Sequence, residues 1–211
     1  MGDDPPARLD DDALYAGVDR LVARDADLAG IVARHGPPPL WAREPGFATL
    51  VHIILEQQVS LRSAEAAMGR LVAAAGEVSA GAIVATGRER LLPAGLTRQK
   101  TRYLLGLSQD VLDGRLDLDA LALADDQTAR QQLLGFAGVG PWTADIYLLM
   151  ALGRPDIWPV GDLALATAMR RAKRLANVPR FDVQLAIAEA WRPLRAVGAR
   201  ILWHSYLAGE R

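Results

Sequence analysis

The fold is decided by one stretch of the sequence, LLGFAGVGPWTADIYLLMALGRPDIWPVGD, which spans Leu133–Asp162. Gly138 and Gly140 flank a single valine, so the backbone there can take positive φ and approach another molecule without interference from a Cβ atom. A helix is expected from Pro141 to about Leu152, because Gly153 and the prolines beyond it prevent continuation. The pattern predicts two helices joined by a glycine hairpin, with Asp162 at the start of the next helix.

The start of the second hairpin helix is suited to bind an anion. Pro141 fits the first helical position, where its missing N–H costs nothing. The amides of Trp142 and Thr143 then point out of the positive end of the helix dipole. Phosphate is the expected guest of such a helix start.

Every element predicted from the remaining sequence is a helix, and no segment alternates long enough to be a strand. Runs of apolar residues at helical spacing, with glycine, proline and capping residues at their ends, define the boundaries. The expected helices cover about 12–34, 46–55, 61–75, 80–85, 88–92, 98–113, 125–134, 163–175, 182–190 and 193–207.

Three proline residues, Pro37 to Pro39, form the best internal boundary of the chain. We therefore expect an N-terminal helix in 1–40 that packs with the C-terminal lobe. A central lobe is expected over 41–160, ending in the helix-hairpin-helix at about 125–152, and C-terminal helices over 161–211 complete the second lobe.

A polar junction follows the helix at 46–55, which is apolar on nearly every side and is expected to be buried. The junction reads Glu56, Gln57, Gln58 and precedes the next helix. A side chain from such a junction is expected to protrude into a cleft. The alternative is that the glutamines only cap the end of the helix.

Composition excludes several classes of protein. The 211 residues contain no cysteine, which excludes disulfides, a thiolate nucleophile and Cys-ligated zinc or iron–sulfur clusters. The apolar runs are shorter than the roughly 20 residues of a bilayer span. The acidic N-terminus does not resemble a secretion signal, so a cytoplasmic protein is expected, associated with the nucleoid in a bacterium.

Net charge is −1, but the charges are unevenly distributed along the chain. Residues 1–28 hold eight acidic and three basic residues (−5), whereas residues 170–211 hold nine basic and three acidic (+6). A basic C-terminal region can bind phosphate locally despite a neutral total. An ordinary solvated helix face is an equally good interpretation.

Three segments resemble one family. They are GFAGVGPWTA with Asp162 beyond it, FATLVHIILEQQVS at Phe47–Ser60, and WRPLRAVGARILW at Trp191–Trp203. Together they resemble the helix-hairpin-helix (HhH-GPD) DNA glycosylase superfamily, and within it the alkylation-repair branch of 3-methyladenine DNA glycosylase II. The resemblance implies an all-α, two-lobed fold with the active-site cleft between the lobes. It also implies a monomeric enzyme that flips alkylated purines out of double-stranded DNA and hydrolyses the N-glycosidic bond.

Asp162 is the candidate catalytic residue. Cleavage of an N-glycosidic bond passes through an oxocarbenium-like sugar, which a fixed carboxylate stabilises. One carboxylate suffices when alkylation has already made the leaving base cationic. A helix N-cap is the structural alternative for Asp162, and the two roles are compatible. Asp145, expected to be structural, and Asp156, expected to be solvated, are the rival carboxylates.

The candidate substrate-binding residues are aromatic, because an electron-poor cationic base stacks well on an indole. The resemblance places Trp203 in the pocket wall, with Trp142, Trp158 and Phe47 as further candidates. Core packing is the alternative for each tryptophan. A pocket tyrosine that some members carry four residues after Trp142 is Ile146 here, which leaves substrate preference open.

The resemblance also implies residues that contact DNA. Gln58 matches the residue that fills the space left by the extruded base, with Ser60 as the alternative. Independently of the resemblance, Lys100 near the start of the helix expected at 98–113 is a candidate phosphate contact, and simple solvation is an equally good interpretation. The hairpin with Gly138, Gly140 and Thr143 is expected to grip the DNA backbone. No organic cofactor is implied, although the backbone carbonyls of Phe136 and Val139 are candidates to hold a Na⁺ or K⁺ ion.

Three other functions stay open at this stage. A helix-hairpin-helix module that binds DNA without catalysis is disfavoured by Asp162, and a helical scaffold is disfavoured by the hairpin. A glycosylase for oxidised or mismatched bases is disfavoured by the absence of cysteine and of a lysine at position 142. The only lysines are Lys100 and Lys173, so a Schiff-base lyase step is not expected.

Overall fold

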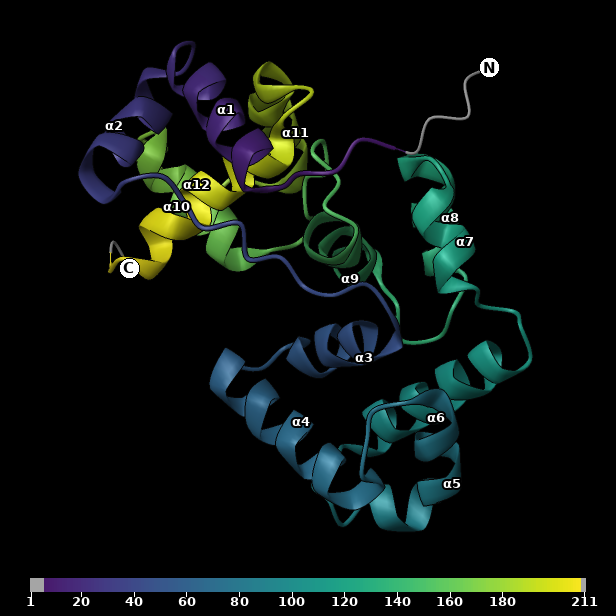
Figure 1. The fold of residues 1–211 in the computed structure, drawn as a ribbon. Helices are drawn as coiled ribbons and strands as arrows, with labels where there is room; N and C mark the ends of the chain where they lie inside the picture. Colours follow the sequence, from purple (N-terminus) through teal and green to yellow (C-terminus); the bar gives the residue numbers. More distant parts are fainter. Residues whose placement is uncertain (1–5, 210–211) are drawn as a thin grey trace. The chain divides into compact units, whose positions relative to one another are not determined.

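The computed structural model describes residues 6–209, and no strand occurs among them (Figure 1). The all-α fold class is therefore confirmed. The chain forms two compact units. Unit 1 contains Arg43–Tyr147, and unit 2 contains Pro6–Ala42 together with the described residues from Leu148 onward.

Unit 1 is built around one buried helix, α3. The helices of this unit are α3 (Phe47–Glu56), α4 (Leu61–Ala75), α5 (Ala80–Leu91), α6 (Arg98–Leu112), α7 (Leu118–Leu123), α8 (Asp126–Leu134) and α9 (Pro141–Ile146). Helix α3 packs against α4, α6 and α9. All apolar side chains from Leu50 to Leu55 are fully buried, and only the polar His52 among these residues is partly exposed. This burial confirms the expectation of a central helix.

Unit 2 is organised around the C-terminal helix. Its helices are α1 (Asp11–Val22), α2 (Ala26–His35), α10 (Leu163–Ala172), α11 (Phe181–Ala188) and α12 (Arg195–Leu207), with a short 3₁₀ turn at Glu189–Trp191. In Figure 1 the purple N-terminal helices and the yellow α12 lie in the same part of the molecule, and α1, α2 and α10 all contact α12. The N-terminal helices α1 and α2 therefore share one core with the C-terminal helix α12.

Arg200 of α12 ties three segments of unit 2 together. Its buried guanidinium donates hydrogen bonds to the carbonyl oxygens of Leu40 at 2.8 Å, Leu149 at 2.9 Å and Ala196 at 3.1 Å. Burial without a carboxylate partner among these contacts lowers the pKa of Arg200 to about 10. The carbonyls are satisfied by a charged donor, which holds the proline-rich linker against α12.

Most predicted helix boundaries are confirmed, because they depend on local capping. Gly36, Gly76, Gly114 and Gly153 all follow helices with positive φ, and Thr97 caps α6 by accepting the amide of Lys100. The helices expected at 80–85 and 88–92 are separated by a non-helical Gly87, as predicted.

One helix prediction is wrong, and one helix was missed. The single helix expected at 12–34 is two helices, because Asp25 accepts the amides of Asp27 and Leu28 and so starts a new helix. The short helix α7 was not predicted. The second hairpin helix continues beyond α9 as a π-helix at Tyr147–Ala151.

The division into units differs from the boundaries expected at 40 and 160. The second boundary lies between Tyr147 and Leu148, inside the π-helix. The physical reason is that residues just beyond it bond within unit 2. Arg200 donates to the carbonyl of Leu149, and the amide of Ala196 donates to the carbonyl of Pro155 at 2.9 Å.

Across residues 6–209 no single helix has the length and apolarity of a membrane span. Only α4 and α5 taken together reach that length, and they are bent by 92° at the break between them.

Candidate functional site

The glycine hairpin joins α8 to α9 in unit 1. The amide of Val139 donates to the carbonyl of Phe136 at 3.1 Å and closes the turn. Gly138 has φ +93°, as the sequence predicted. A Cβ at Gly138 would lie 2.6–2.8 Å from Tyr103 of α6. Gly138 is therefore required by its backbone conformation and by close packing inside unit 1.

Gly140 differs from its neighbouring glycine. It is the N-cap of α9 with φ −87° and ψ 177°, which is extended backbone open to any residue. The expectation of positive φ at Gly140 is wrong. A Cβ at this position would meet nothing within 4 Å, so the helix start is open to an approaching molecule.

The side chain of Thr143 is turned inward. It is 1% exposed, and its hydroxyl accepts a hydrogen bond from Gln57 Nε2 at 2.7 Å. The same nitrogen donates to the carbonyl of Gly138 at 2.7 Å. The Thr143 side chain belongs to the interior bracing of the hairpin, and contact of Thr143 with DNA through its backbone amide stays a prediction.

Lys100 also has a different role from the one expected. Its ammonium donates to the carbonyls of Leu55 at 2.7 Å and Gln57 at 3.1 Å, at the C-terminal end of α3. Burial lowers the pKa of Lys100 from its ordinary value. A cation at this end of a helix is favourable because the last carbonyls carry partial negative charge. Lys100 is a helix cap rather than an exposed phosphate contact.

Gln58 and Ser60 both lie on the exposed turn between α3 and α4. Gln58 has φ +58°, an uncommon conformation for a residue with a side chain. Ser60 is the N-cap of α4, and its hydroxyl accepts the amide of Ser63 at 3.2 Å. The structure thus leaves Gln58 as the protruding residue of the pair and gives Ser60 a local structural role.

Asp162 and Trp203 lie together in unit 2. Asp162 is the N-cap of α10, where its Oδ1 accepts the amide of Leu165 at 2.8 Å. The same oxygen accepts the indole Nε1–H of Trp203 at 3.2 Å. Trp203 is 7% exposed. The capping and the catalytic interpretations of Asp162 are therefore compatible, and an indole is held beside the carboxylate.

The two rival carboxylates are structural. Asp145 is buried and forms an ion pair with Arg130 at 2.6 Å in unit 1. Asp156 was expected to be solvated, and this expectation is wrong. It pairs with Arg195 at 2.9 Å and Arg192 at 3.1 Å within unit 2.

The other aromatic candidates occupy different environments. Trp158 is 4% exposed, and its ring centroid lies 5.6 Å from that of Trp191. The substrate-binding interpretation of Trp158 is corrected to core packing. Trp142 and Phe47 are half-buried. Tyr147, next to the position where some members carry a pocket tyrosine, is fully buried and accepts the amide of Gly46 at 2.9 Å.

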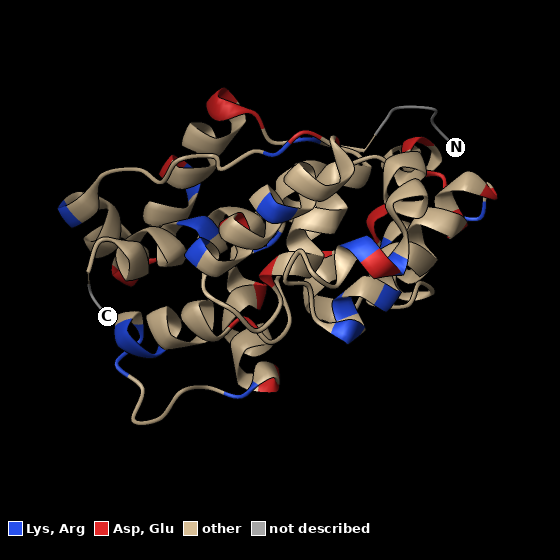
Figure 2. Ribbon diagram, turned by 90° about the horizontal axis from the view of Figure 1, so that it is seen from below, with Lys and Arg blue, Asp and Glu red and all other residues tan. Residues whose placement is uncertain are grey.

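Part of the basic C-terminal region is neutralised inside unit 2. Lys173 binds Asp25 at 2.7 Å and Asp27 at 3.0 Å, and Arg174 binds Asp27 at 2.9 Å. Basic and acidic segments are interspersed in Figure 2. Asp25 and Asp27 near the N-terminus thus pair with basic residues near the C-terminus, which reduces the positive charge that 170–211 could offer to phosphate.

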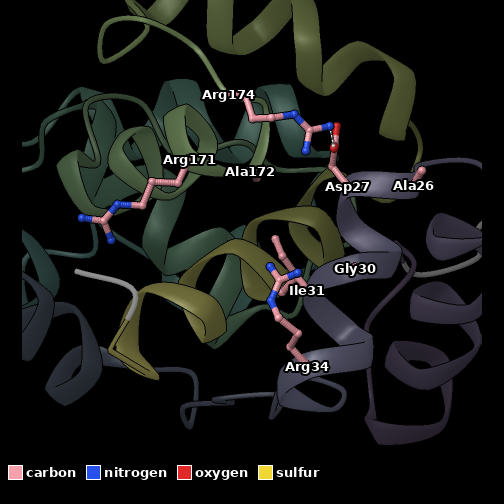
Figure 3. Close-up of a pocket in the computed structure, with 8 residues that line it drawn as sticks. All are labelled: Ala26, Asp27, Gly30, Ile31, Arg34, Arg171, Ala172 and Arg174. Atoms are coloured by element: carbon pink, nitrogen blue, oxygen red, sulfur yellow. Dashed lines mark hydrogen bonds and ion pairs between the residues drawn. The ribbon is translucent and has the colours of Figure 1, made fainter.

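A cavity of about 160 Å³ lies at α2 and the end of α10 in unit 2. In Figure 3 Arg174 reaches Asp27, Arg34 points toward Ile31, and Arg171 extends away from both of the other arginines. Ligand pockets usually measure about 300–1,000 Å³. This cavity is small and contains none of the predicted site residues.

Among residues 6–209, no three His, Cys, Asp or Glu side chains lie close enough together to bind a metal ion.

Sequence reasoning missed Gln57. The polar junction after α3 was recognised, but only Gln58 was assigned a role. The contacts of Gln57 with Gly138 and Thr143 join residues that are 81 and 86 positions apart. No local pattern predicts such a contact.

Comparison with known proteins decides the family. The family model for "HhH-GPD superfamily base excision DNA repair protein" matches residues 51–193. The chain belongs to the HhH-GPD superfamily. This HhH-GPD protein is 28% identical over 186 residues to a putative DNA-3-methyladenine glycosylase of Bacillus subtilis, covering 84% of the chain and 65% of the relative. It is 36% identical over 208 residues to a probable bifunctional transcriptional activator/DNA repair enzyme AlkA of Mycobacterium tuberculosis, covering 92% of the chain and 40% of the relative. The chain therefore spans less than two thirds of the length of these relatives.

Solved structures share the fold. A DNA-3-methyladenine glycosidase of Bacillus halodurans matches with a TM-score of 0.77 and 28% identity, covering 92% of this HhH-GPD protein and 91% of that chain. A 3-methyladenine DNA glycosylase of Schizosaccharomyces pombe, solved in complex with abasic DNA, matches with a TM-score of 0.80 and 21% identity, covering 89% and 95%. The HhH-GPD glycosylase fold is confirmed over nearly the whole chain.

Proposed function

We propose that this HhH-GPD protein is a monofunctional DNA glycosylase that excises alkylated purines of the 3-methyladenine and 7-methylguanine type. The observation that carries the proposal is the pair formed by Asp162 and Trp203 in unit 2, joined at 3.2 Å. The names of the relatives from B. subtilis and B. halodurans support 3-methyladenine as a substrate. The S. pombe structure with abasic DNA supports duplex DNA as the partner.

Asp162 supplies negative charge where the sugar becomes positive. As the base leaves, the sugar takes oxocarbenium character, and a fixed carboxylate stabilises that charge more than it stabilises the neutral sugar. The amide of Leu165 and the indole of Trp203 both donate to Oδ1. These donors hold the carboxylate in one orientation before the substrate arrives, so little reorganisation accompanies the reaction.

Trp203 has the chemistry needed to select the base. An alkylated purine carries positive charge, and the electron-rich face of an indole attracts a cation by about 0.5–2 kcal/mol. An uncharged purine gains less from the same face. Selection by charge also explains why one carboxylate suffices, because a cationic base leaves without prior protonation.

The lysines argue for a monofunctional reaction. A Schiff base with the sugar requires a lysine near the anomeric carbon. Lys100 caps α3, and Lys173 binds Asp25 and Asp27. The position that would carry the lysine of a bifunctional relative is Trp142. Water is therefore the proposed nucleophile.

Unit 1 carries the proposed DNA contacts. The open start of α9 at Gly140 presents backbone amides to a phosphate, and such contacts hold DNA without reading its sequence. Gln58, exposed on the α3–α4 turn, is the proposed residue that fills the duplex after the base is flipped.

We propose that the hairpin carbonyls bind a monovalent cation. The Phe136 oxygen accepts the Val139 amide at 3.1 Å and keeps a second lone pair. The carbonyls of Phe136 and Val139 would hold the ion, which would add positive charge facing a DNA phosphate.

The decisive test is base release from duplexes that carry one defined lesion each. Wild-type protein should release 3-methyladenine and 7-methylguanine but not 8-oxoguanine. Asp162→Asn should bind lesion DNA normally and lose most single-turnover release, because asparagine also caps helices but carries no charge. Asp182→Asn, an exposed acidic residue of α11, is the matched control. Near-normal release by Asp162→Asn would refute the catalytic assignment, and no release by wild type from any alkylated duplex would refute the function.

A further inference from the structure

The side chain of Gln57 connects two elements that are distant in sequence. It follows the last residue of α3, and its Nε2 donates to Gly138 O and to Thr143 Oγ1, both at 2.7 Å. A carbonyl oxygen only accepts hydrogen bonds, so the nitrogen of the amide, not its oxygen, must face Gly138. Both protons of the amide nitrogen are used in these two bonds.

The backbone of Gln57 is held from a third direction. Its carbonyl accepts the ammonium of Lys100 at 3.1 Å, and the same ammonium binds Leu55 O at 2.7 Å. The next residue is Gln58, whose φ is +58°. The turn that carries Gln58 is thus fixed to α6 through Lys100 and to the hairpin through Gln57.

We propose that Gln57 is a positioning residue that couples the Gln58 turn to the glycine hairpin, so that both engage duplex DNA in one fixed register. The effects of this coupling on bound DNA rest on the proposed function. It explains why the Thr143 hydroxyl is turned inward: it serves as an acceptor for the brace and not as a contact for phosphate.

Fixed register matters because two contacts must form together. A phosphate bound at the hairpin sets the position of the duplex. The Gln58 side chain can then enter the duplex only if the gap between two base pairs lies opposite it. A brace that exists before binding removes the cost of ordering the two loops at the moment of contact. Without Gln57, the Gly138 carbonyl loses its donor and the hairpin is free to shift.

The brace makes a specific prediction for DNA affinity and for exchange. Gln57→Ala should weaken affinity for lesion-free duplex by up to about tenfold, because the unbraced hairpin must then be ordered when DNA binds. Amide hydrogen exchange of residues 135–143 in the free protein should quicken. Gln109→Ala is the matched control, because Gln109 is an exposed glutamine of unit 1 whose side chain donates to Asp113 on the following turn. It should leave both measurements unchanged.

A double-mutant cycle separates coupling from stability. Gln58→Ala should slow single-turnover release several-fold in the wild-type background and by less than twofold in the Gln57→Ala background. An equal slowing in both backgrounds, with unchanged affinity for lesion-free duplex, would show that Gln57 is structural only and would overturn the proposal.

Two further variants keep the test valid if Gln57→Ala folds poorly. Thr143→Ser keeps the accepting hydroxyl and should behave as wild type, whereas Thr143→Val removes it and should reproduce part of the loss of affinity. Equal affinities for these two variants would also overturn the proposal. If the wild type binds duplex but releases no alkylated base, the proposed function fails while affinity and exchange still decide the coupling.

Discussion

Gly138→Ala tests the hairpin directly, because two separate costs apply at this position. The backbone has φ +93°, where a residue with a Cβ pays about 1–2 kcal/mol. The new methyl group would also lie 2.6 Å from Tyr103 Cγ and 2.7 Å from Tyr103 Cβ. Tyr103 Cβ is fixed to α6, so rotation of the tyrosine does not relieve the clash. Overpacking of this kind costs about 1–3 kcal/mol.

The net effect follows from these magnitudes. Alanine restricts the unfolded chain and returns about 0.4–1 kcal/mol. Gly138→Ala should therefore destabilise the protein by roughly 1–4.5 kcal/mol. Gly140→Ala is the matched control, with φ −87° and nothing within 4 Å of the new methyl group, and should change stability by less than about 1 kcal/mol.

Equilibrium unfolding in urea, followed by circular dichroism, measures both variants. With m of about 2 kcal/mol/M, Gly138→Ala should lower the midpoint by roughly 0.5–2 M, at an unchanged slope. Equal midpoints for the two glycine variants would refute the reasoning from conformation and packing. A stable Gly138→Ala that binds lesion-free duplex normally would show that the hairpin tolerates an ordinary turn residue.

Three further predictions concern separate parts of the molecule. Burial raises the pKa of Asp25, but hydrogen bonds from Lys173, Trp191 and the Leu28 amide outweigh it and hold the pKa below the ordinary 3.8. The stability that this carboxylate contributes should be present above about pH 4 and lost as the pH falls toward the lowered folded pKa. When unfolding is measured against pH, the free energy of unfolding should therefore fall more steeply in wild type than in Asp25→Asn. Trp203→Phe, which loses the bond to Asp162, should slow single-turnover release by roughly three- to tenfold. Trp158→Phe should leave release unchanged, because the buried Nε1 of Trp158 has no hydrogen-bond partner among residues 6–209. Equal rates for the two variants would contradict the role of the Asp162–Trp203 pair. Gln58→Ala should slow release from a paired lesion more than from a lesion opposite an abasic gap, where less stacking is lost; equal slowing would show that Gln58 does not fill the duplex.

Local sequence determined the helices and the hairpin of this protein. Helix ends are set by residues within one turn of each other, and Gly36, Gly76, Gly114 and Gly153 mark them in the sequence because positive φ favours glycine. The burial of α3 could also be predicted from local sequence, because a helix that is apolar on every side has no face for solvent. Asp162 could be predicted as the start of a helix, and its distance along the sequence from the glycine hairpin indicated a functional role.

Tertiary structure alone decided which side chains meet. Lys173 and Asp25 are 148 positions apart, and their ion pair neutralises charges that looked available for phosphate. Gln57 and Gln58 are chemically identical neighbours, yet one braces the hairpin and the other is exposed. The physical reason is that capping and φ preferences act over a few residues, whereas the partners of a polar side chain depend on how distant helices pack.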